Sequence, residues 1–125
     1  MTDLQADPPL RRLVISVCPR ELGVVVLAVE RGQRRRRLDA RGVRQELEGL
    51  IARRGLGHLV SVHEACVGGC HGEGPNVGVT IYRVALPGEQ ESHVAIGWRN
   101  YVYLIDELDC LATIVDENLT ADPSA

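Results

Sequence analysis

One segment with the periodicity of an amphipathic helix lies between two short β-branched runs, and this order restricts the possible folds more than any other feature. The apolar residues of that segment fall on one helical face, at Val43, Leu47, Leu50 and Ile51. The runs at 13–18 and 59–63 are short and apolar, as buried strands are. If these strands are neighbours joined by a helix over 39–54, they run parallel.

Both ends of the expected helix carry termination signals. Asp39 stands where a side chain can accept a hydrogen bond from the first turn, which is the role of an N-cap. Arg53 and Arg54 place positive charge in the last turn, where the helix dipole is negative. Gly55 follows, as glycine commonly does just beyond a helix.

The remaining patterns predict a hairpin and a second helix. Residues 76–84 and 92–98 are expected to be strands, with a turn at Pro87-Gly88-Glu89 between them. From Val102 onward a helix is expected, because apolar residues fall on one face at Leu104, Leu108, Leu111 and Val115. The apolar run 23–29 is either a strand or a loop that covers the core.

Together these elements predict an α/β fold with one mixed sheet of four or five strands and two main helices. The domain is expected to span 11–118, with a flexible arm over 1–10 and a flexible tail over 119–125. Its length of 125 residues suits one domain with a core of its own.

Cysteine usage follows from the compartment that the sequence indicates. No stretch approaches the roughly 20 apolar residues of a membrane span, and the acidic first residues lack the apolar core of a signal peptide. We therefore expect a cytoplasmic protein without membrane contact. Thiols stay reduced there, so the 4 cysteines indicate metal ligands or redox groups before they indicate a disulfide framework.

Charge is distributed unevenly along the chain, and every basic residue is arginine. Residues 1–62 contain 12 arginines against 7 acidic residues, whereas residues 63–125 contain 2 against 10. Such a division can steer charged partners. A basic turn is expected over 31–37, and its run Arg34 to Arg37 is either a solvated turn or a docking patch for an acidic partner. The net charge of −3 and the scarcity of aromatic residues argue against nucleic acid.

The cysteines suggest a metal site. Cys66 and Cys70 bracket two glycines, and two thiols separated by a glycine-rich loop can turn onto one metal while the backbone wraps it. Cys18 ends the first predicted strand, so parallel pairing of the strands would bring it to the same sheet edge. Thiolates bind soft metals and iron–sulfur clusters. We therefore expect an iron or zinc site at that edge.

Three stretches in this order carry a resemblance to a known family: Val17-Cys18, then residues 64–70, then residues 74–79. The chain resembles the thioredoxin-like 2Fe-2S ferredoxins and the related small subunit of NADH:quinone oxidoreductase and of some hydrogenases. Ala95-Ile96-Gly97 fits the same pattern, and the resemblance covers about residues 12–116. It implies a thioredoxin-like ferredoxin fold, a bound 2Fe-2S cluster, one-electron exchange with a redox partner protein, and a homodimer.

One position departs from that family, which has a second cysteine shortly after the first, whereas residues 19–65 contain none. Carried over position by position, the first, third and fourth cluster ligands are Cys18, Cys66 and Cys70. Three outcomes follow. A 2Fe-2S cluster uses a non-cysteine fourth ligand, with His71 the nearest candidate and His63 the next. Alternatively, the three cysteines and one histidine hold zinc, or the site holds nothing.

The resulting functional expectation is an electron carrier or accessory subunit that does no bond chemistry itself. The alternative is a cluster-free or zinc-binding interaction module that keeps the fold. A thiol-redox enzyme is disfavoured because the Cys-x-x-Cys motif is absent, and no nucleophile–base–acid set is recognisable. Cys110 is interpreted as a half-buried residue of the final helix, with a ligand role as the alternative, and the nearby acidic residues as that helix's solvent face.

Overall fold

A computed structural model describes residues 11–19, 23–66, 75–84, 88, 90, 94–101 and 108–119 of the chain. Within these residues the chain forms six strands and two helices. In chain order they are β1 (Arg11–Val17), β2 (Val25–Leu27), β3 (Arg36–Leu38), α1 (Ala40–Arg53), β4 (Val60–Glu64), β5 (Val77–Arg83), β6 (Gly97–Tyr101) and α2 (Ala112–Leu119). The predicted arm over 1–10 lies outside the described residues. Of the predicted tail over 119–125, Leu119 is the last residue of α2, and residues 120–125 lie outside the described residues.

Four strands form the main sheet, in the order β4-β1-β5-β6. β1 runs parallel to β4, with Val17 opposite Glu64, and antiparallel to β5, with Val17 opposite Val77. The predicted strand–helix–strand unit is confirmed, because α1 joins β1 and β4 and these are parallel neighbours. The predicted α/β class, with one mixed sheet and two main helices, is confirmed as well.

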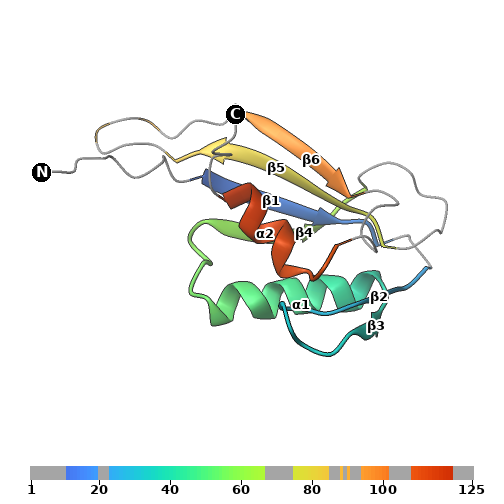
Figure 1. Ribbon diagram of the computed structural model, residues 1–125. Helices are drawn as coiled ribbons and strands as arrows, with labels where there is room; N and C mark the ends of the chain where they lie inside the picture. The colour runs from blue at the N-terminus through green and yellow to red at the C-terminus, as the bar shows by residue number, and fades with distance from the viewer. Residues whose placement is uncertain are drawn as a thin grey trace, which may run out of the picture.

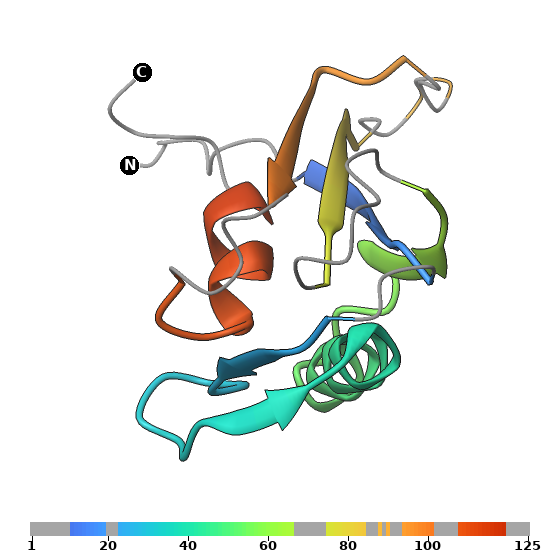
Figure 2. The same ribbon diagram turned by 90° about the vertical axis from the view of Figure 1, so that its right-hand side faces the viewer.

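Both helices lie on the same side of the main sheet (Figure 1, Figure 2). Successive strand residues point to opposite faces, so Leu13, Ile15 and Val17 are buried against the helices while the residues between them are partly exposed. The helices contribute the matching apolar faces, with Leu47 and Ile114 fully buried. Burying one such side chain stabilises the fold by about 1.5–3 kcal/mol, so this layer is its main source of stability.

The ends of α1 are set by the residues that the sequence indicated. Asp39 caps the first turn, because its Oδ1 accepts a hydrogen bond from the Gly42 amide at 2.7 Å. After Arg53 the chain leaves the helix through Gly55, whose φ of +67° lies in the left-handed region that favours glycine. The predicted helix and both of its termination signals are therefore confirmed.

β2 and β3 pair with each other in a separate two-stranded sheet, which we call the ribbon (residues 25–38). Figure 2 shows the ribbon beside α1, away from the main sheet. Val25 and Leu27 point into the core, which explains the apolar run over 23–29. The run does contain a strand, but this strand is not a fifth strand of the main sheet. The expected basic turn over 31–37 was also too long, because β3 begins at Arg36.

The second helix begins later than expected. The periodicity predicted a helix from Val102, but α2 starts at Ala112 and Leu108 lies in a bend, while 102–107 lie outside the described residues. The backbone before the helix pairs with another segment instead: the amides of Leu111 and Ala112 donate hydrogen bonds to the carbonyls of Ala28 and Val29, both at 2.9 Å. Cys110 therefore precedes the helix and is buried, contrary to the expected half-buried helical position.

The last strand is also displaced from its expected position. β6 spans Gly97–Tyr101 instead of 92–98. The residues just before it form bends, and pairing with β5 starts where the Ile96 amide donates to the Ile81 carbonyl at 2.7 Å. At the predicted turn, Gly88 has a φ of +89°, whereas Pro87 and Glu89 lie outside the described residues.

Arg54 joins three parts of the fold at one guanidinium group. Its Nη1 donates to Asp116 Oδ1 of α2 at 2.6 Å, and its Nη2 donates to Glu30 Oε1 of the ribbon loop at 3.1 Å. The three side chains are partly exposed, so each ion pair contributes less than about 1 kcal/mol. The group therefore orients the ribbon and α2 more than it stabilises the domain.

Tyr101 connects β6 to α2. Its hydroxyl donates to Glu117 and accepts a hydrogen bond from Asn118 Nδ2 at 2.9 Å. Arg99 forms an ion pair with the same Glu117 at 3.2 Å. Burial of the phenol, together with the hydrogen bond to Glu117, raises the pKa of Tyr101 to about 12.

We predict that Leu47→Ala lowers the free energy of unfolding by about 3 kcal/mol, because Leu47 is fully buried between α1 and the sheet and its loss leaves a cavity. Urea unfolding followed by far-ultraviolet circular dichroism measures the change. Glu48→Ala, on the exposed face of the same helix, should change stability by less than about 0.5 kcal/mol. Equal losses in the two variants would contradict this packing.

We also predict that stability falls between about pH 10 and pH 12. The native state holds the Tyr101 proton more tightly than the unfolded chain, whose tyrosine pKa is about 10. This contribution is complete below about pH 10 and is lost as the pH rises through the folded pKa. Tyr101→Phe should make the fall shallower, and Tyr82→Phe controls for removing another phenol. Urea midpoints across this range measure the effect, and an unchanged slope in Tyr101→Phe would refute it.

Candidate functional site

The carboxyl ends of β1 and β4 meet at one edge of the main sheet, and each is followed by a cysteine. Val17 and Glu64 are the last paired residues of the two strands. The pairing continues one step beyond them, because the Ala65 amide donates to the Val17 carbonyl at 3.1 Å. Cys18 and Cys66 are the next residues on the two chains. The structure therefore brings these two cysteine-bearing strand ends together, as the parallel pairing required.

Cys18 and Cys66 have different surroundings. Cys18 is 0% exposed, although it is not part of the contiguous apolar core beneath the helices. Its amide donates to the Asn76 carbonyl at 3.1 Å, which fixes the chain between β4 and β5. Cys66 is exposed. One thiol at this edge is thus enclosed by protein and the other is accessible.

The structure does not bring the other predicted ligands that it describes to this edge as a group. Cys70 and His71 lie outside the described residues, and within the described ranges no three cysteine, histidine or acidic side chains are grouped closely enough to hold a metal. Cys110 lies in the core, where its Sγ is 3.5 Å from Thr113 Oγ1. His63 is exposed on β4, with its Nε2 3.2 Å from Ser61 Oγ.

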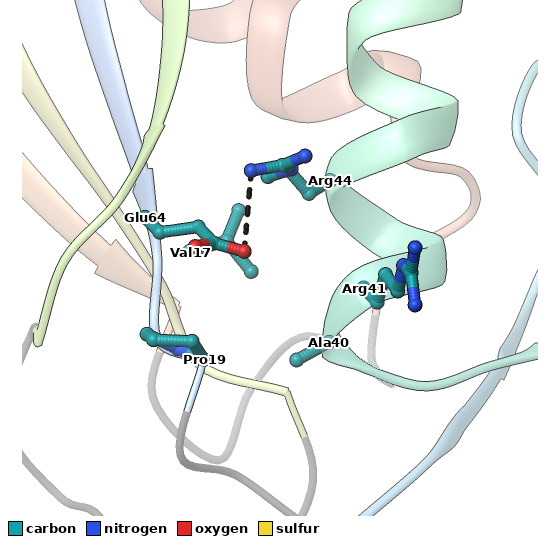
Figure 3. A pocket seen from close by; sticks show the side chains of 6 residues that line it. All are labelled: Val17, Pro19, Ala40, Arg41, Arg44 and Glu64. Carbon is teal, nitrogen blue, oxygen red and sulfur yellow. Dashed lines mark ion pairs between the residues drawn. The ribbon is translucent and has the colours of Figure 1, made fainter.

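A pocket of about 390 Å³ opens on the helix side of this edge. Figure 3 shows Arg44 of α1 extending across it toward Glu64 of β4, and their closest charged atoms, Nη1 and Oε2, are 3.1 Å apart. The pocket wall is completed by four further side chains, Val17, Pro19, Ala40 and Arg41. Within the described part of the chain, the buried Nε atom of Arg44 has no hydrogen-bond partner. The pocket wall therefore carries both positive and negative side chains, and it includes Pro19, the residue that follows Cys18.

A second hollow lies on the opposite face of the sheet, which the two helices leave uncovered (Figure 2). This groove has a volume of about 230 Å³, and its wall is formed by Ser16, Cys66, Gly78, Val79, Thr80, Trp98 and Asn100. Trp98, which lines this groove, is exposed by 75%, and Val94 and Ile96, which precede β6, are exposed by 73% and 55%. Cys66 therefore borders an open sheet face that carries an exposed indole.

The exposure of these apolar side chains was not predicted from the sequence. Val94, Ile96 and Trp98 alternate with other residues, and they fall in the run 92–98 that was predicted as a strand. Period-two alternation shows that one face differs from the other. It does not show which face the helices cover, because that depends on where α1 and α2 pack against the sheet.

Comparisons of the chain with protein-family models, curated proteins and solved structures gave no match. Neither described helix has the length and apolar composition needed to cross a bilayer.

We predict that iodoacetamide modifies Cys66 of the reduced native protein at least about tenfold faster than Cys18 or Cys110, because an enclosed thiol reacts only when the structure opens. Peptide mass spectrometry after timed quenching measures the three rates. In urea, where the chain is unfolded, the three should become similar. Rapid native modification of Cys18 would contradict its enclosure.

Proposed function

We propose that the chain is a ferredoxin-like electron-transfer or accessory protein, which binds a 2Fe-2S cluster through Cys18, Cys66, Cys70 and a non-cysteine fourth ligand. His71 is the nearest candidate for that ligand. The observation that carries the proposal is the parallel pairing of β1 and β4, because it delivers Cys18 and Cys66 to one sheet edge. Resemblance to the thioredoxin-like ferredoxins supports the choice of cluster.

The donor set fits this group chemically. Thiolates are soft ligands that iron–sulfur clusters and zinc prefer. Cys66 begins the glycine-rich segment that contains Cys70 and His71, so these candidate donors follow one strand end while Cys18 follows its parallel neighbour. When bound, a cluster of this type would accept and release one electron.

The chain's own residues would enclose one side of the cluster and leave the other side accessible. The enclosed Cys18 would stand on a side that excludes water, whereas Cys66 borders the exposed face of the sheet. An imidazole ligand would make metal binding pH-dependent, because a ligating histidine must be deprotonated. A homodimer and a cytoplasmic location belong to the proposal through the family resemblance and the composition.

The second candidate is a zinc-binding or metal-free interaction module of the same fold. The observation that favours it is the absence of any cysteine over 19–65, where the family has its second ligand. Three cysteines and one histidine would satisfy the tetrahedral coordination of structural zinc.

The proposal predicts that anaerobically purified protein is brown, contains iron and acid-labile sulfide, and loses its visible absorption with dithionite. Cys18→Ser and Cys66→Ser should each lower the bound iron at least about tenfold, because each removes a ligand. Cys110→Ser, a buried cysteine outside the edge, is the matched control and should keep its iron. Colourless protein with zinc would support the second candidate, and folded protein without metal would reject the cluster.

His71→Cys tests the fourth ligand separately. If His71 is a ligand, its replacement with a thiolate should shift the visible absorption and lower the reduction potential. A spectrum and potential equal to those of the wild type would exclude this role and leave His63 as the next residue to replace.

A further inference from the structure

The ribbon carries an accumulation of positive charge that its own surroundings do not neutralise. Residues 31–41 contain six arginines and a single carboxylate, Asp39, whose Oδ1 is occupied as the cap of α1. Within the described chain, Arg36 alone among these arginines forms an ion pair, with Glu46 at 2.8 Å. The neighbouring Glu30 is already bound by Arg53 and Arg54. Among the described residues, five exposed arginines therefore have no acidic partner, and these are Arg31, Arg34, Arg35, Arg37 and Arg41.

The pairing of the ribbon explains why the charge of Arg37 faces outward. Val26 lies opposite Arg37 in the ribbon, and both side chains are exposed, Val26 by 52%. Their neighbours Val25 and Leu38 point into the core, so the ribbon cannot rotate its outer face inward without exposing its apolar side. Val24, which precedes Val26 by two residues, is exposed by 39%. We call the exposed residues Val24, Val26, Arg31, Arg34, Arg35, Arg37 and Arg41 the arginine surface.

The arginine surface reaches the edge that carries Cys18. Arg41 lies in the first turn of α1 and lines the pocket that Pro19, the residue after Cys18, also lines. Figure 2 shows the ribbon running into the N-terminal end of α1 on the side of the molecule where β1 ends. A partner that covers this surface would therefore lie next to the candidate site.

We propose that the arginine surface docks an acidic surface of a partner protein. Charge complementarity selects an acidic partner, since arginines without counter-ions attract carboxylates and speed encounter. The exposed valines among them favour a protein over nucleic acid, because arginine combined with apolar contacts is typical of protein interfaces. The net charge of −3 for the whole chain opposes association with the continuous phosphate backbone of nucleic acid.

The inference rests on the proposed function only in taking the partner to be a redox protein, and its test is a binding measurement that does not depend on metal content. The probes are polyglutamate and a glutamate–leucine copolymer of equal charge. Comparison probes are a double-stranded oligonucleotide and vesicles with an anionic phosphatidylglycerol fraction. Fluorescence anisotropy of labelled probes, or co-sedimentation for the vesicles, at low and at physiological salt gives the affinities.

The wild type should bind the copolymer more tightly than polyglutamate, and added salt should weaken both. Arg35→Gln combined with Arg37→Gln should weaken binding of both polymers by about fivefold, from two surface charges. His58→Glu combined with Gln90→Glu changes the net charge equally at exposed positions outside the arginine surface and should leave the affinities within about twofold. Val26→Ser should reduce binding of the copolymer and leave polyglutamate binding unchanged.

Three results would overturn the proposal. Tighter binding of the oligonucleotide or of the vesicles, lost in the Arg35→Gln/Arg37→Gln variant, would assign the surface to another class of partner. An equal loss of binding in the control variant would show that only the net charge of the protein matters. Unchanged binding in both variants would show that the arginines are merely solvated. None of these results changes the iron content of the protein, so this proposal and the proposed function fail independently.

Discussion

The hydrogen bonding of β1 on both sides is the constraint on which the rest of the structure depends. β1 is an inner strand of the main sheet, parallel to β4 and antiparallel to β5. The parallel pairing requires a crossover, which α1 supplies, and that crossover places the start of α1 beside the end of β1. The antiparallel pairing fixes Asn76 beside Cys18. Two strand ends, a helix start and a strand start thus converge at one edge because of the pairing of a single strand.

Convergence of this kind is the reason for proposing a site at this edge. Backbone positions there are held by the sheet, whereas side chains after the last paired residue are no longer required to pack in the core. Cys18 and Cys66 occupy this position on adjacent strands, and one is enclosed while the other is accessible. The helix side of the edge carries an arginine–glutamate pair, and the other side opens onto an uncovered sheet face. A group bound here would therefore experience two different environments.

The ends of α1 depend on interactions between residues that are close in sequence, and these ends were predictable from the sequence. Asp39 and Gly55 mark the ends of α1 through hydrogen bonding and backbone conformation that involve near neighbours only. The start of α2 was not predictable in this way, because the amide of Leu111 bonds to the distant Ala28. The same holds for the ribbon: the apolar run over 23–29 predicted burial, but its pairing partner depends on tertiary packing. At the edge, the sequence predicted that Cys18 and Cys66 converge, whereas their unequal exposure depends on neighbouring segments.

The uncovered face of the sheet has one further consequence, which concerns the optical properties of the chain. Trp98 is the single tryptophan, and it is 75% exposed in the folded state beside the Cys66 groove. Its indole is already surrounded largely by water, so unfolding should move its emission maximum only slightly. A molecule that binds to the open face and covers the indole would instead shift the emission to shorter wavelength. Fluorescence of Trp98 therefore reports binding to that face.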